Sequence, residues 1–566
     1  MRIRDGILRR GLAPLVLLAL LALVPAAAGA ATIVINNVDG PGEGFNDPTP
    51  VAPVGGNPGT TLGQQRLNVF QYAANLWGAI LPSAVTIQVN AAFNPLTCTS
   101  TSAVLGSAGP SFVFRDFAGA VFPGTWYHSA LADKLAALEL GGIPDLNSQF
   151  NSNLNGSPGC LGGASWYYGY DFNEGSNVDL LPVVLHELGH GLGFSTLTNG
   201  ATGQYFNSFP STFDHFLTDL STGLTWNAAS QAQRAASAIS VTGLGWSGWD
   251  GKAAAGAYLS KRARVLVNSP PGIAGNTFGN AALFGAPLTS PGVTADIVLV
   301  NDGVGTTSDG CEAIVNSVAG KIALIDRGTC AFVLKAANAQ AAGAVGVIIA
   351  NNVAGEFVPG GTDPSIVIPV IGVTQAFGNT LKAELLNGPV NATLGLHPTQ
   401  LAGTDPTGRP LMYAPNPFQS GSSVSHWDVS MTPNTLMEPA INTDLTGVDI
   451  TTGAFRDIGW LPTLASAPAP GGTGRVAFTG APRPNPATSG TAIGFRLPGP
   501  EFVRLAVYDV RGARVATLEN RMLPPGDHVA RWDGRTAGGL EAAPGVYLVA
   551  LTTSQGTLTQ RVSVLR

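Results

Sequence analysis

The chain has few charges, few cysteines and no strongly basic segment. Only 11% of its 566 residues are charged, and the 29 lysines and arginines are outnumbered by 35 aspartates and glutamates. Because a typical soluble domain contains about 25% charged residues, this surface must depend on uncharged polar side chains. Nucleic-acid-binding proteins normally present a cationic patch, so the sequence argues against nucleic acid as a partner.

Long hydrophobic runs are absent after the first thirty residues. No later segment has the roughly 18 consecutive apolar residues of a membrane-spanning helix, so no transmembrane span is expected. Residues 1–30 combine four arginines, an apolar run over 12–24 and a small-residue site at Ala28-Gly29-Ala30. This pattern is typical of a secretory signal peptide. It predicts a protein that is secreted or held at the cell surface.

Cysteine is scarce, with four residues, all of them after the predicted signal peptide. An even number of cysteines in an exported protein favours disulfides. Four cysteines allow three pairings. We expect Cys98–Cys160 and Cys311–Cys330, because this pairing keeps each bridge within one domain.

Glycine and proline are abundant, with 73 and 41 residues spread along the chain. This composition favours strands and turns and argues against an all-helical protein. At about 100–200 residues per domain, the length suggests three or four domains. Changes in pattern divide the chain after residue 30 into a mixed strand-and-helix block (31–265), an α/β block (266–398), a second mixed block (399–463), a linker rich in Ala, Pro and Gly (464–482) and a block of short strands (483–566).

Local patterns predict secondary structure in three of these blocks. Apolar residues at three- to four-residue spacing predict a helix over 67–81. Residues 321–350 have the order strand, helix, strand, with the helix over 332–342, as in a βαβ unit. Past residue 483, five or six short strands about 8–12 residues apart predict a β-sandwich.

One segment carries a specific chemical signal, namely His186, Glu187 and His190 in the sequence HELGH. On a helix, residues four apart share a face, so both imidazoles can reach one metal ion. Zinc binds two neutral imidazoles plus a third protein ligand and leaves a position for water. Glu187 can accept a proton from that water, as in H-E-x-x-H metallopeptidases. We therefore expect a zinc site on this helix.

The third ligand does not follow from the helix itself. The extended pattern H-E-x-x-H-x-x-G-x-x-H of metzincins continues here as far as Gly193, where a turn would end the helix. Thr196 then stands at the third histidine position. The open candidates are histidines and carboxylates further along the chain: Asp214, His215, Asp219 and His426. Of these, only His426 is followed by a methionine, Met437, of the kind that forms a Met-turn beneath the metal.

Four segments together resemble the leishmanolysin-like (M8-type) metallopeptidases, which are metzincins: residues 186–194, 425–427, 436–439 and 456–460. The resemblance implies that His186, His190 and His426 bind one zinc ion. It also implies that Glu187 is the general base and that Met437 is the Met-turn residue. The 232 residues between Gly193 and His426 exceed the separation expected for that family.

The other blocks have resemblances of their own. Residues 320–350 look like part of a protease-associated (PA) domain, which implies a PA domain (266–398) inserted into a metzincin-like catalytic domain formed by 31–265 and 399–463. The motifs around 484–487, 506–512 and 545–548 resemble the Ig-like domain of flagellar hook-capping proteins and the sorting domains of secreted bacterial enzymes. This implies contact with secretion machinery or the cell surface. The predicted fold class is multidomain α+β.

The sequence thus predicts a secreted zinc endopeptidase acting on protein or peptide substrates. One alternative is a gluzincin-type peptidase whose third ligand is Asp214, His215 or Asp219. Another is an inactive adhesive protein that binds through its PA and Ig-like modules. A structural calcium ion is left open, because loops rich in Asp, Asn and Gly are present but no calcium-loop motif is.

Overall fold

The computed structural model describes residues 30–461 and 476–565, apart from 143, 442–444, 446, 489, 498–500, 510–513, 524–525, 537–539 and 554–555. The predicted signal peptide up to residue 29 and residues 464–475 of the predicted linker lie outside the described residues. Within the described part, none of the helices combines the length and the apolar character needed to cross a membrane.

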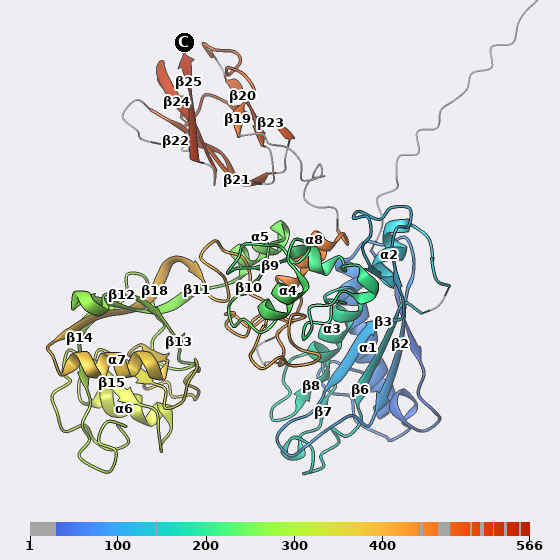
Figure 1. Ribbon diagram of the computed structural model, residues 1–566, viewed down its shortest axis with the longest axis horizontal. Helices are drawn as coiled ribbons and strands as arrows, with labels where there is room; N and C mark the ends of the chain where they lie inside the picture. The colour runs from blue at the N-terminus through green and yellow to red at the C-terminus, as the bar shows by residue number, and fades with distance from the viewer. Residues whose placement is uncertain are drawn as a thin grey trace, which may run out of the picture.

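A four-stranded sheet forms the base of the first block (Figure 1). Its strands, in spatial order, are β1 (Ile33–Asn37), β2 (Ile87–Asn94), β6 (Leu146–Asn151) and β3 (Gly106–Pro110). The first three run parallel, and β3 is antiparallel at the edge. Parallel strands need covered faces, and helices α1 (Leu62–Ile80) and α3 (Leu180–Gly191) pack together against this sheet.

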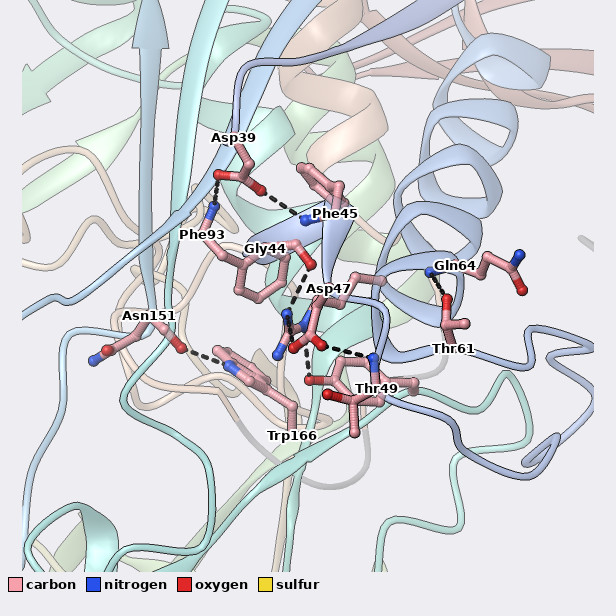
Figure 2. A network of polar contacts seen from close by, with 12 residues as sticks. Asp39, Gly44, Phe45, Asp47, Thr49, Thr61, Gln64, Phe93, Asn151 and Trp166 are labelled. Atoms are coloured by element: carbon pink, nitrogen blue, oxygen red, sulfur yellow. Dashed lines mark hydrogen bonds and ion pairs between the residues drawn. The ribbon is translucent and has the colours of Figure 1, made fainter. Parts of the chain in front are cut away.

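Helix α1 begins five residues before the predicted start at 67, because Thr61 caps it by accepting a hydrogen bond from the Gln64 backbone N–H. The polar network in Figure 2 holds the preceding segment against the sheet. The Asp39 carboxylate accepts from the backbone N–H groups of Phe45 and Phe93. One side chain thereby ties the backbone of residue 45 to that of strand β2.

A guanidinium completes this network from α1. Arg66 donates to the Gly44 carbonyl at 2.7 Å and pairs with the Asp47 carboxylate at 3.3 Å. The Asp47 side chain also accepts from the Thr49 backbone N–H (Figure 2). Since Arg66 is only 9% exposed, its charge needs this partner.

The remaining elements of the two mixed blocks are short. They are the strands β4 (Val113–Phe114), β5 (Tyr127–His128), β7 (Trp166–Tyr167), β8 (Val178–Asp179), β9 (Leu217–Asp219) and β10 (Leu244–Trp246), and the helices α2 (Ser129–Ala136), α4 (Gln231–Ser237), α5 (Trp249–Tyr258) and α8 (Thr451–Ile458). Helix α8 packs on α5 although nearly 200 residues separate them. A single hydrophobic core joins residues before 260 with residues after 411, so the two mixed blocks fold as one body.

The intervening block contains an eight-stranded sheet with the helices α6 (Phe332–Ala341) and α7 (Gln375–Leu385). Its strands, in spatial order, are β12 (Gly275–Phe278), β11 (Lys261–Ser269), β18 (Val390–Leu401), β14 (Val293–Leu299), β15 (Ile322–Asp326), β16 (Gly346–Ala350), β17 (Val370–Val373) and β13 (Asn280–Ala281). The antiparallel pair β11 and β18 leads the chain out of the first mixed block and into the second (Figure 1). The predicted βαβ unit is β15, α6 and β16, in which the two strands are parallel.

The C-terminal block has two sheets around its own hydrophobic core. One sheet contains β19 (Ala477–Phe478), β20 (Thr491–Leu497) and β23 (Gly526–Trp532), and the other contains β22 (Arg514–Leu523), β21 (Glu501–Tyr508), β24 (Gly545–Thr553) and β25 (Gly556–Val564). Both sheets are antiparallel. The arrangement is a β-sandwich, as the strand spacing predicted.

Candidate metal centre

Helix α3 carries the H-E-x-x-H sequence through the hydrophobic core that the two mixed blocks share. Asp179 caps its start by accepting a hydrogen bond from the Leu181 backbone N–H at 3.0 Å, which satisfies one of the free donors of the first turn. All twelve residues of the helix are buried. His186 and His190 are 5% and 9% exposed, so both imidazoles lie in a dry site.

The helix ends in a Schellman motif that depends on Gly193. The Phe194 N–H bonds the Gly189 carbonyl at 3.0 Å, and the Gly193 N–H bonds the His190 carbonyl at 3.1 Å. Gly193 has a φ of +123°, a backbone conformation that side chains with a Cβ rarely adopt. The turn brings the Phe194 carbonyl back to His190, whose Nδ1 it contacts at 2.8 Å.

The three histidines of the predicted site come together, although the third is 236 residues from the second. The Nε2 atoms of His186 and His190 are 3.1 Å apart, and each is 3.2 Å from Nε2 of His426. Every Nδ1 faces a backbone carbonyl. The carbonyls of Leu436, Phe194 and Ser422 accept from His186, His190 and His426 at 2.6, 2.8 and 2.7 Å.

This donor set fits a zinc ion. Because each Nδ1 must donate its proton to a carbonyl, each Nε2 has a lone pair, and three lone pairs converge with no proton between them. Nitrogens bound tetrahedrally at about 2.0–2.1 Å lie about 3.3 Å apart, close to the separations here. Burial lowers the pKa of His186 to about 3 and of His190 to about 4, and it lowers the pKa of His426 well below its usual value. The neutral imidazole is the form that binds a metal.

The turn after His426 orients the first ligand. Within Thr435–Glu438, the Glu438 N–H bonds the Thr435 carbonyl, and the Glu438 carboxylate accepts from the Thr435 N–H at 2.7 Å. Asp449 accepts from the Leu436 backbone N–H and from Thr451. Since the Leu436 carbonyl receives His186 Nδ1, Asp449 fixes that imidazole indirectly.

Met437 lies directly beneath the helix. It is fully buried, and its backbone carbonyl accepts from the Trp427 N–H at 2.8 Å. A Cβ on Gly189 would come within 2.8 Å of the Met437 sulfur. The glycine between the two helix histidines thus allows the methionine to pack close to the floor of the site.

Glu187 follows His186 in α3 and is 8% exposed. Burial raises the pKa of its carboxyl to about 8, although a hydrogen bond from the Ala108 backbone opposes the shift. Ala108 belongs to the edge strand β3, and a Cβ on Gly106 of the same strand would contact the Glu187 side chain at 3.1 Å. The carboxyl group is therefore held between the helix and the sheet edge.

The other candidate ligands have partners elsewhere. Asp214 accepts hydrogen bonds from the hydroxyls of Thr196 and Thr198 at 2.5 and 2.7 Å. His215 contacts the Thr125 hydroxyl and the Asn227 side chain and stacks on Phe122, and Asp219 accepts from Ser221. Among the described residues, the histidine group that could share one metal ion is His186, His190 and His426.

Sequence reasoning missed several groups at this site. The three carbonyls that orient the imidazoles have no sequence signal, because every residue carries a carbonyl. Asp449 and Ala108 act through hydrogen bonds to or from the backbone, and neither belongs to a motif. The disulfides Cys98–Cys160 and Cys311–Cys330 have the expected pairing.

Comparison with known proteins identifies the two accessory domains. Residues 293–381 match the PA domain family, and residues 484–557 match the FlgD Ig-like domain family. The chain is therefore a multidomain α/β protein with a PA domain and a C-terminal Ig-like domain. The three histidines lie outside both matches.

Relatives match the chain over short stretches. An aminopeptidase of Pseudomonas aeruginosa is 56% identical over 64 residues, which are 10% of this chain and 12% of the relative. The minor extracellular protease Vpr of Bacillus subtilis is 33% identical over 108 residues, covering 19% of this chain and 13% of Vpr. An aminopeptidase structure from Aneurinibacillus sp. strain AM-1 has 30% identity and a TM-score of 0.20, with 25% of this chain and 31% of that chain covered. The chain thus spans between about a tenth and a third of these relatives.

Proposed function

We propose that the protein is a secreted zinc metallopeptidase that cleaves internal peptide bonds of protein substrates. The observation that carries the proposal is the convergence of three Nε2 atoms within 3.1–3.2 Å of one another, in a chain where the residue after His186 is the buried Glu187. His186, His190 and His426 would hold one zinc ion. Bound there, zinc would supply a Lewis acid that polarises the substrate carbonyl and acidifies water.

Glu187 is the general base in this proposal. Its carboxylate takes a proton from the attacking water as the water oxygen bonds to the carbonyl carbon of the substrate. The resulting carboxylic acid then gives the proton to the leaving amine as the C–N bond breaks. Burial favours the neutral acid and raises the pKa of Glu187 to about 8, which makes its carboxylate a stronger acceptor.

We place the catalytic domain among metzincin-like folds of the leishmanolysin (M8) type. Three features support this placement: the turn at Gly193, the third histidine supplied from the far side of the inserted PA domain, and Met437 beneath the helix. Thr196 replaces the histidine of the short metzincin motif and instead bonds Asp214. The same domain content fits an extracellular or cell-surface protein whose Ig-like domain contacts secretion machinery or the surface.

Cleavage of an unfolded protein and of a peptide blocked at both ends tests the proposal. We expect wild type to cleave both, a zinc chelator to stop it, and Glu187→Ala to lose at least about 10²-fold in rate while keeping its zinc. If only peptides with a free amino terminus are cleaved, the protein is an aminopeptidase and not an endopeptidase. Full activity of Glu187→Ala would contradict the mechanism, and an inert zinc-loaded wild type would favour the adhesive alternative.

A further inference from the structure

A second cluster of metal-binding groups lies in the catalytic domain, apart from the three histidines. Asp133, Glu139 and Asp145 each offer a carboxylate oxygen, and these oxygens lie within 4.8 Å of one another. Asp133 and Asp145 are 2% and 1% exposed. Two buried carboxylates beside a third would repel one another strongly unless a positive charge were present.

Within the described part of the chain, no basic side chain supplies such a charge. Among the described residues, no ion pair involves these three carboxylates. Lys134, the neighbour of Asp133 on α2, directs its Nζ to the Gly459 carbonyl at 2.7 Å. Burial, with the neighbouring carboxylates, raises the pKa of Asp145 to about 7, as expected for an uncompensated acid.

One carboxylate oxygen of Asp133 has no hydrogen-bond donor among the described residues. Asp133 Oδ1 accepts from the Leu140 backbone N–H at 2.8 Å, whereas Oδ2 is buried and receives no hydrogen bond from the described residues. A buried acceptor without a donor costs about 1–3 kcal/mol, and more when it is charged. A cation between the carboxylates would satisfy this atom.

The surrounding backbone holds the three side chains in place. Glu139 accepts from the Gly142 N–H at 3.2 Å, and Asp145 accepts from the Gln88 N–H of β2 at 2.8 Å. The set contains oxygen ligands alone, which suit a hard cation rather than zinc. Two oxygens on one calcium ion lie at most about 5 Å apart, because each Ca–O distance is about 2.3–2.6 Å.

We propose that Asp133, Glu139 and Asp145 form a calcium site that ties the end of α2 to strands β2 and β6 of the catalytic sheet. This site is independent of the proposed zinc centre. Glu139 is exposed, so it gives the ion a path to solvent. The calcium ion would attract the three carboxylates, which otherwise repel one another, at the point where α2, β2 and β6 meet. It would thereby stabilise the sheet that supports α3.

Calcium titration of the zinc-loaded full chain tests the proposal, using calcium chloride alone as the probe. We expect wild type to bind a single calcium ion per chain and to melt at a higher temperature with calcium. Asp133→Asn and Glu139→Gln should each weaken calcium binding at least about tenfold, because affinity follows the ligand charge. Glu139→Gln changes an exposed residue, so it keeps the test valid if Asp133→Asn does not fold.

Glu312→Gln is the matched control. It belongs to a second group of two buried aspartates and one exposed glutamate, Asp302, Asp309 and Glu312 in the PA domain. There, the Asp309 carboxylate accepts from Cys311 and Thr329 and the Lys335 ammonium lies nearby. Calcium binding unchanged in Glu312→Gln supports the assignment. If wild type binds no calcium, Asp133 and Asp145 share a proton instead. If Glu139→Gln binds calcium as tightly as wild type, the ion lies elsewhere. Either result overturns the proposal.

Discussion

Replacing Gly193 by alanine should lower both the stability of the fold and the affinity for zinc, although Gly193 is not one of the proposed zinc ligands. The residue has a φ of +123°, in a region that only glycine adopts without strain of about 1–3 kcal/mol. An added Cβ would also meet the end of the Ile458 side chain at 3.0 Å. Relaxing the strain would move Phe194, and the hydrogen bond from its N–H to Gly189 contributes about 1 kcal/mol.

These terms together predict a loss of about 2–4 kcal/mol in the free energy of unfolding. The same movement shifts the Phe194 carbonyl away from His190 Nδ1. Losing a group that orients a metal ligand typically costs 10–100-fold in affinity. We therefore also expect zinc binding to weaken about 10–100-fold.

Urea unfolding followed by tryptophan fluorescence measures the first effect, and competition with a chelator measures the second. Fluorescence reports mainly on the two mixed blocks, because eight of the nine tryptophans lie in them and Trp532 lies in the C-terminal block. Gly256→Ala is the control, since Gly256 is an exposed residue of α5 with open space around it. It should gain about 0.5–1 kcal/mol. If Gly193→Ala unfolds at the same urea concentration as wild type and binds zinc equally tightly, the turn at Gly193 does not position His190.

Three further changes have definite outcomes. Asp449→Ala removes the acceptor that holds the Leu436 backbone, so zinc affinity should fall about 10–100-fold in chelator competition; unchanged affinity would count against this positioning role. Burial raises the pKa of Asp179 to about 6, above the 3.8 of an ordinary aspartate, so the folded state binds more protons between these values and its stability falls as pH rises through that window. Asp179→Asn keeps the cap and lacks the titrating carboxyl. Its free energy of unfolding, measured with urea, should therefore rise relative to that of wild type between pH 4 and pH 6. The same pH dependence in both proteins would show that Asp179 does not titrate in this range. Removing the Cys98–Cys160 bridge, whose ends are 62 positions apart in sequence, should cost about 4 kcal/mol in unfolding free energy, and a loss below about 1 kcal/mol would contradict this estimate.

Local sequence patterns predicted the parts of the structure that depend on local interactions. The helix expected over 332–342 is α6, Phe332–Ala341, because its apolar spacing suits one buried face. The H-E-x-x-H segment is helical and buried on all sides. The helix expected at 67 starts at Leu62, since its cap, Thr61, lies before the apolar pattern begins.

The rest of the site depends on contacts between distant segments. His426 reaches the other two imidazoles only because the chain returns from the PA domain into the same core. Spacing alone left Asp214 and His215 open as alternatives, and the structure gives both of them other partners. The acidic cluster around Asp133 had no recognisable motif, because α2, the loop after it and the residue just before β6 each contribute one carboxylate.

The zinc content of His426→Ala, measured beside wild type and His215→Ala after dialysis, tests the central claim most directly. We expect one zinc ion per chain in wild type and in His215→Ala. We expect a large loss of zinc in His426→Ala, because His426 brings its Nε2 within 3.2 Å of the Nε2 atoms of both helix histidines. Zinc retained by His426→Ala and lost from His215→Ala would contradict it and would support a gluzincin-type site instead.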